Sequence, residues 1–243
     1  MSTFNTTKLV IAASVATLVT ACGGGGGSTG NSESQGFWVG PASTGYTVSA
    51  VVLDSGETWG VYTSGTTIYG ALYGRTTVSG NNVSVVGMDF NFLSNSSLPG
   101  TLTGTISPKS SMSLRSGAGV TLPLTYQSSY DSAASAAAVM GTWSFIGRSG
   151  SYTLVPGFIT VNGSGQFILN QTNCVTSGSI VPRSGGKNVY NVTLTAAGSG
   201  CAVGQSSLSG VAYVDTAVTP NKFLSLALTS NQGDGVIVIG TKQ

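Results

Sequence analysis

Few residues of this chain are suited to acid–base chemistry. Its 243 residues include seven Asp and Glu and no His, so chemistry that needs an imidazole is excluded. Asp54 and Glu57 lie three residues apart, but their surroundings predict a hairpin turn, where carboxylates are usually solvated. A glycosidase needs two carboxyl groups about 5–9.5 Å apart in a cleft. We therefore interpret this pair as turn residues and expect no catalytic residue.

Asp89 is a separate case because aromatic residues surround it in the segment Met88-Asp-Phe-Asn-Phe92. We interpret it as a strand-edge or turn carboxylate that accepts backbone hydrogen bonds, with a catalytic carboxylate as the alternative. Serines are frequent, but no Gly-x-Ser-x-Gly segment has a base to activate it. The two cations of Arg183 and Lys187 indicate a polar hairpin tip, or else a contact with an anionic glycan or lipid headgroup.

The N-terminus carries the most specific signal. Lys8 precedes an uncharged, mostly apolar run over residues 9–20, which is shorter than the roughly 20 residues that a membrane-spanning helix needs. These features are typical of a secretory signal peptide. The segment Leu18-Val-Thr-Ala-Cys22 resembles the lipobox of bacterial lipoproteins, in which the cysteine becomes the first mature residue and is acylated. The resemblance implies a signal peptide over residues 1–21 and lipidation of Cys22. The alternative is an ordinary signal peptide in which Cys22 is incidental.

Cys22 and the residues after it indicate how the protein is attached to a membrane. Several acyl chains on one cysteine form a stable membrane anchor. In the lipoprotein family an Asp after the cysteine favours the inner membrane, and Gly23 stands there instead, so the resemblance implies the outer membrane. Residues 22–35 then form a Gly/Ser-rich tether with a span of about 20 Å. A membrane-spanning barrel is not expected, because the predicted strands are mostly shorter than the 9–11 residues it needs.

The two remaining cysteines, Cys174 and Cys201, predict a disulfide. Exported compartments permit disulfides, and a loop of this length gains roughly 3.5 kcal/mol from the cross-link in the chain-entropy model. A zinc site would lack partners, since the chain has no His and no Cys-x-x-Cys pair. We therefore expect no metal and no cofactor.

The composition indicates an all-β protein with no nucleic-acid partner. Nine Lys and Arg against seven Asp and Glu give a net charge of only +2, too weak for nucleic-acid binding. Segments rich in Val, Ile, Thr and Tyr alternate with Gly, Ser and Asn, which is typical of short strands and turns. The expected strands cover residues 46–53, 57–63, 66–73, 83–86, 89–93, 101–106, 120–126, 152–155, 158–161, 166–170, 189–195, 207–214, 223–229 and 236–239.

The chain divides into two similar halves. A Gly-x-Trp triplet opens each one, at Trp38 and at Trp143. Between them, the Ala-rich residues 131–140 predict a short helix with Asp131 as its N-cap. The predicted fold class is all-β, with two small antiparallel β-barrel or sandwich units at 36–128 and 141–243. A short helical connector at 129–140 joins them.

Two hairpins in the first unit allow a prediction of strand register. Two-residue turns at Ser55-Gly56 and Ser64-Gly65 would pair Val52 with Trp59 and Val61 with Ile68. Alternation of side chains then predicts one core face and one opposite face. The core face would hold Val48, Ala50, Val52, Trp59, Val61 and Ile68. The opposite face would hold Val51, Leu53, Tyr62, Tyr69 and Tyr73, either packed on the partner unit or exposed as an aromatic binding patch.

A Gly-x-Trp at the start of a small antiparallel barrel is similar to the opening of lipocalins, avidins and other calycins. That resemblance implies a ligand cavity inside a barrel, lined by Trp38, Trp59 or Trp143. The lipobox, tether and barrel-like halves also resemble surface lipoproteins of the transferrin-binding-protein-B and factor-H-binding type. The chain departs from that group in having few Lys and Glu, so the host-protein ligands of the group are not expected.

Together these features predict a non-enzymatic outer-membrane lipoprotein that acts as a binding or envelope-interaction module. Its expected partners are the membrane, through the lipid anchor, and an envelope protein or a small ligand. The candidate ligand-facing aromatic residues are Trp38, Trp59, Tyr62, Tyr69 and Trp143. The alternatives are a carbohydrate-active periplasmic enzyme that uses carboxylates, and a structural or inhibitory plug for another envelope protein.

Overall fold

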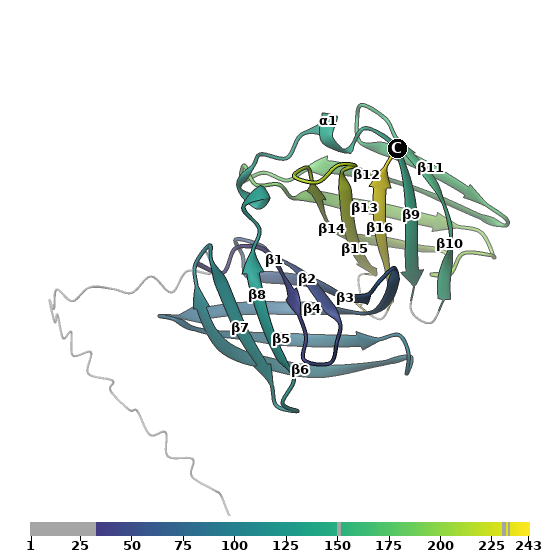
Figure 1. Cartoon of the computed structure of the whole chain (residues 1–243). Helices are drawn as coiled ribbons and strands as arrows, with labels where there is room; N and C mark the ends of the chain where they lie inside the picture. Colours follow the sequence, from purple (N-terminus) through teal and green to yellow (C-terminus); the bar gives the residue numbers. More distant parts are fainter. Residues whose placement is uncertain (1–32, 150–151, 230–231, 233) are drawn as a thin grey trace, which may run out of the picture.

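The computed structural model describes residues 33–149, 152–229, 232 and 234–243. The predicted signal peptide, Cys22 and most of the tether lie outside the described residues. Within the described part, the chain forms sixteen strands in two closed antiparallel barrels of eight strands each (Figure 1). The predicted fold class is confirmed in its more specific form, two barrels rather than two sandwiches.

The first barrel is an up-and-down ring in which each strand pairs with the next and the last pairs with the first. Its strands are β1 (Gly36–Pro41), β2 (Thr47–Val52), β3 (Glu57–Ser64), β4 (Thr67–Ser79), β5 (Asn82–Asn91), β6 (Ser96–Ser107), β7 (Ser111–Ser116) and β8 (Thr121–Tyr126). Its three central strands, β4 to β6, are 13, 10 and 12 residues long. These long strands make one side of the barrel taller than the other.

The second barrel repeats the same plan and closes through the pairing of β16 with β9. Its strands are β9 (Gly141–Ser149), β10 (Tyr152–Val161), β11 (Gln166–Gln171), β12 (Cys174–Pro182), β13 (Tyr190–Ala197), β14 (Ser206–Asp215), β15 (Lys222–Thr229) and β16 (Gly235–Lys242). One strand of each barrel, β5 and β10, was predicted as a pair of shorter strands. Gly87 lies inside β5, and a β-bulge near Gly157 keeps β10 continuous.

The predicted hairpin register in the first barrel is wrong by one residue. The backbone N–H of Leu53 donates to the oxygen of Glu57, and Gly56 has a φ of 84°. The loop is therefore a three-residue turn that ends on a left-handed glycine, and Val51, not Val52, pairs with Trp59. Because side chains alternate along a strand, this shift moves each residue of β3 to the other face.

The next predicted turn is also displaced. Ser64 pairs with Thr67, so the two turn residues are Gly65 and Thr66. A bulge after Tyr62 shifts the ladder again, so that Val61 pairs with Ala71 and not with Ile68. The face assignment changes as a result. Tyr62 lies on the inner face of the barrel with Val48, whereas Val61 lies on its outer face.

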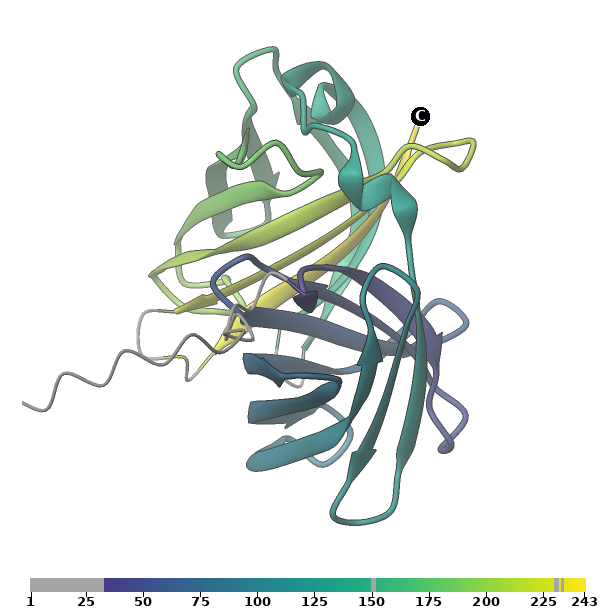
Figure 2. The same cartoon turned by 90° about the vertical axis from the view of Figure 1, so that its left-hand side faces the viewer.

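The outer face of β1 to β4 packs against the outer face of the second barrel, mainly on β14 to β16. Figures 1 and 2 show the two barrels lying wall to wall, with the linker crossing between them at one side. The buried residues of this interface are Phe37, Val51, Leu53, Trp59, Val61, Ile68, Ala71, Tyr130, Val189, Val211, Tyr213, Leu224, Leu226 and Ile237. The Phe37 and Tyr213 rings stack at 3.8 Å between centroids. The face that sequence patterns left open between packing and binding is therefore largely an interface between barrels.

Polar contacts also cross this interface. Arg148 of β9 donates hydrogen bonds to the backbone oxygens of Ile68 and Phe92, at 3.4 Å and 3.1 Å. Its guanidinium carbon lies 5.4 Å from the centroid of the Phe92 ring. Arg148 of the second barrel thus bonds to two separate segments of the first barrel.

The linker contains much less helix than the sequence predicts. A 3-10 turn, η2, covers Ser128–Asp131, and the α-helix α1 covers only Ala136–Val139. Ser135, not Asp131, is the N-cap, since its side chain accepts a hydrogen bond from the N–H of Ala138. Between these two turns, the N–H of Ala134 donates to the backbone oxygen of Lys187 in the second barrel. Tertiary contacts therefore override the helical propensity of the Ala-rich segment.

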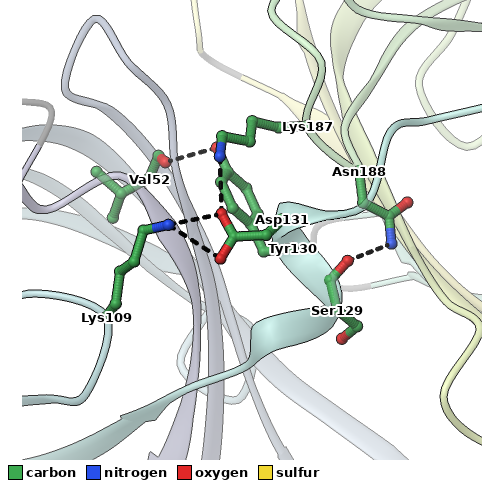
Figure 3. A network of polar contacts seen from close by, with 7 residues as sticks. All are labelled: Val52, Lys109, Ser129, Tyr130, Asp131, Lys187 and Asn188. Carbon is green, nitrogen blue, oxygen red and sulfur yellow. Dashed lines mark hydrogen bonds and ion pairs between the residues drawn. The ribbon is translucent and has the colours of Figure 1, made fainter.

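Asp131 instead holds a junction between the barrels (Figure 3). Its carboxylate accepts from Lys187 of the second barrel at 2.7 Å and from Lys109 of the first barrel at 3.1 Å. Beside it, the Tyr130 hydroxyl donates to the backbone oxygen of Val52. Asn188 donates to the backbone oxygen of Ser129 at 3.1 Å. Both barrels are thus bonded to the linker at the point where it passes between them.

The two Gly-x-Trp triplets occupy equivalent places in the two barrels. Trp38 and Trp143 lie on the first strand of each and are fully buried. The indole N–H of Trp38 donates to the backbone oxygen of Ser34, and that of Trp143 donates to the backbone oxygen of Val139. Each bond therefore reaches back four residues. The similarity of the halves lies in this construction.

The second barrel contains the predicted disulfide. Cys174 and Cys201 are bonded, with their Cα atoms 4.9 Å apart. The bond joins the start of β12 to the loop between β13 and β14. It therefore fixes one end of the second barrel only.

Candidate ligand-binding site

The first barrel encloses a cavity of about 500 Å³. Ligand pockets in proteins usually have volumes of about 300–1,000 Å³, so this lumen is large enough for one small molecule. Most of its lining is apolar. The lining includes Trp38, Val48, Ala50, Val52, Leu72, Val85, Leu102, Met112, Leu114, Leu122 and Leu124.

A row of glycines lines part of this cavity. Gly74, Gly87 and Gly100 are paired side by side across β4, β5 and β6, and all three line the cavity. A Cβ at Gly74 or Gly87 would lie 2.4 Å or 2.2 Å from a backbone oxygen of the neighbouring strand. A Cβ at Gly100 would have no atom within 4 Å. The wall here is therefore bare backbone, and at Gly100 it faces open space.

The second barrel has no comparable cavity among its described residues. Its interior hollow measures about 90 Å³. Large side chains such as Phe145, Phe167 and Phe223 fill it. Two barrels of the same strand number therefore differ in kind, because one has a packed core and the other has a hollow one.

The lumen of the first barrel is open at one side. Residues 96–101 of β6 pair with β5, but the pairing of β6 with β7 begins only at Leu102. Leu98 lies in this overhanging part, lines the cavity, and is 64% exposed. Pro99 lies beside it and has no N–H to offer to another strand, which protects an open strand edge. The wall of the lumen is therefore an unpaired and exposed strand edge at this side.

A carboxylate and two tyrosines lie inside this otherwise apolar cavity. The Tyr62 hydroxyl donates a hydrogen bond to Oδ1 of Asp89 at 2.9 Å. The Tyr46 ring lies 5.6 Å from that of Tyr62, between centroids. All three residues line the lumen. The carboxylate and these two phenols therefore lie together in the lumen, whose lining also includes the hydroxyl side chains of Thr44, Thr58, Thr76, Thr101 and Ser116.

Among the described residues, Asp89 has no positively charged partner. The ion pairs between the described residues involve Asp131 only. Burial raises the pKa of the Asp89 carboxyl, and the hydrogen bond from Tyr62 opposes that rise. Burial and the nearby Asp89 carboxylate likewise raise the pKa of Tyr62. The site therefore holds an acidic group in surroundings that disfavour its charge.

The five aromatic residues predicted to face a ligand are distributed over different sites. Trp38 and Tyr62 line the lumen. Tyr69 packs against Tyr46 in a tilted arrangement, with the ring centroids 4.9 Å apart. Trp59 lies on the outer face, where it borders a hollow of about 140 Å³ between the barrels. Trp143 lies in the packed core of the second barrel.

The carboxylates considered for catalysis do not come together. Asp89 faces the lumen, whereas Glu57 lies on the outer face and accepts hydrogen bonds from the side chains of Trp59 and Tyr73. Asp54 is exposed in its turn. The interpretation of Asp89 as a strand-edge or turn carboxylate that accepts backbone hydrogen bonds is wrong, since its partner is a phenol inside the barrel. Sequence patterns missed this pair because Tyr62 was predicted on the other face.

The described residues contain no group of three or more potential metal ligands. Among them, no helix has the length and apolar character to span a bilayer.

Comparison with known proteins identifies no family for this chain. No family model matches the chain, and no curated protein matches it. A crystal structure of a candidate outer membrane protein from Bacteroides fragilis aligns with 86% of this chain and 96% of its own, at 11% identity and a TM-score of 0.24. Nothing about this chain follows from a similarity of that size.

Proposed function

We propose that this protein is a lipid-anchored component of the bacterial cell envelope that binds a small apolar molecule in the lumen of its first barrel. The observation that carries the proposal is the cavity of about 500 Å³, in a protein whose second barrel is filled. An empty apolar cavity costs stability, because the side chains around it lose packing contacts. A ligand that fills the cavity would offset this cost, and would therefore explain why glycines line its wall.

The sequence supports a location at a membrane. The lipobox-like segment that ends at Cys22, and the Gly-rich tether after it, would hold the barrels within about 20 Å of the bilayer surface. Apolar molecules dissolve in the bilayer and are poorly soluble in water. A hollow barrel at its surface is suited to take up such a molecule and to shield it from water.

The proposal is tested with N-phenyl-1-naphthylamine, a neutral probe whose fluorescence rises in apolar surroundings. Titration of the full chain is expected to give a saturable rise with one site per chain, and decanol is expected to reverse it by competition. A titration without saturation, or one that decanol does not reverse, would contradict binding in the lumen.

A further inference from the structure

The polar end of the lumen indicates which class of ligand it accepts. We propose that the ligand of the first barrel has a positively charged amine head, which Asp89 binds with the tyrosines around it. This inference rests on the proposed function, since it assigns the head of a molecule whose apolar part fills the lumen.

The first argument is the unmet bonding capacity of the Asp89 carboxylate. A carboxylate has about four acceptor positions on two oxygens. The Tyr62 hydroxyl occupies one of them on Oδ1, and the described residues place no other hydrogen bond on this side chain. Asp89 is half-buried, and a charge held partly out of water gains stability from a partner of opposite charge. An ammonium group of a ligand would supply both the charge and the donors.

The second argument is the aromatic ring beside Asp89. Tyr62 bonds to the carboxylate, and Tyr46, which also lines the cavity, lies 5.6 Å from Tyr62 between ring centroids. Tyr69 extends this row of rings, 4.9 Å from Tyr46. Tyrosine faces attract cations, and clusters of aromatic rings recognise ammonium groups in many proteins. A carboxylate among tyrosines would bind an ammonium group and repel a fatty-acid carboxylate.

The third argument is the sign of the charges around the cavity. The residues that line it include one ionisable acid, Asp89, and no Lys or Arg. Arg148, the cation that reaches the loop after β5, is engaged with the backbone oxygens of Ile68 and Phe92. The lumen therefore offers an anionic group to its ligand and no fixed cation.

The experiment uses three competitors with the same chain and different heads: decylamine, decanol and decanoate. Each displaces N-phenyl-1-naphthylamine from the full chain at pH 7, below the concentration at which micelles form. The wild-type protein is expected to bind decylamine about tenfold or more tightly than decanol, and decanoate more weakly than both. Asp89→Asn keeps the size of the side chain and removes its charge. It should bring decylamine to within about twofold of decanol, while decanol binds as before.

A further variant serves as the control. Asp54→Asn removes one negative charge from an exposed turn and should leave all three affinities unchanged.

The outcomes separate this inference from the proposed function. Equal binding of the three competitors, or an amine preference that survives Asp89→Asn, would overturn the amine head and leave the lumen as a binding site. Failure of the probe and of all three competitors to bind would overturn both.

Discussion

Substitution of Gly100 by Phe should stabilise the protein and close its lumen. A fully buried Phe side chain removes about 150–250 Å² of surface from water. Gly100 lies near the open side, so we take half of that, roughly 100 Å². At about 25 cal/mol per Å² this contributes about 2.5 kcal/mol, and lost rotamer freedom offsets about 1 kcal/mol. The expected gain is about 1.5 kcal/mol, in the usual range for cavity filling.

Thermal unfolding followed by circular dichroism measures this gain. For a protein of this size, 1 kcal/mol changes Tm by about 2–4 °C, so Tm should rise by about 3–6 °C. The same variant should lose the fluorescence response to N-phenyl-1-naphthylamine. Gly163→Phe, in an exposed turn of the second barrel, is the matched control and should bind the probe normally. The reasoning is refuted if Gly100→Phe binds the probe as the wild type does.

Three other predictions concern stability. Burial raises the pKa of Asp89, so the wild-type protein should lose stability as pH rises from the ordinary Asp pKa of about 4 through the raised pKa of the folded state. Asp89→Asn should therefore melt at a higher temperature than the wild type at pH 7 and at the same temperature at pH 3. Identical melting temperatures at pH 7 would count against this. Replacing Cys174 and Cys201 by Ser should lower the free energy of unfolding by about 3 kcal/mol in urea titrations, with probe binding retained because the first barrel has no part in the bond. The hydrogen bonds from Lys187 and Lys109 lower the pKa of Asp131, so the Asp131 carboxylate stabilises the fold above pH ~4, and this stabilisation is lost as pH falls through the lowered pKa. Asp131→Asn should lower the free energy of unfolding by less than about 1 kcal/mol at pH 7 and leave it unchanged at pH 2.

The strand pattern was largely predictable from sequence because it is local. Val, Ile, Thr and Tyr runs between Gly and Ser turns place most of the sixteen strands near their observed positions. The two Gly-x-Trp triplets indicate two similar units, and the buried indoles of Trp38 and Trp143 give that similarity its structural basis. The disulfide followed from the number of cysteines and from the predicted export of the chain.

The inner and outer faces were not predictable, because they depend on one residue of turn length. Gly56 closes a three-residue turn where two residues were expected. That single difference moves Tyr62 into the lumen and Trp59 out of it. The lumen itself depends on Gly74, Gly87 and Gly100, which are far apart in sequence and become neighbours only through the sheet register.

The central claim, that the lumen of the first barrel holds an apolar ligand, is tested most directly by nuclear magnetic resonance of ¹³C-methyl methionine. Met112 is buried and lines the cavity, whereas Met140 is 46% exposed in the linker. Addition of decanol should shift the methyl signal of Met112 and leave that of Met140 in place. A shift at Met140 with none at Met112 would show that the ligand binds elsewhere.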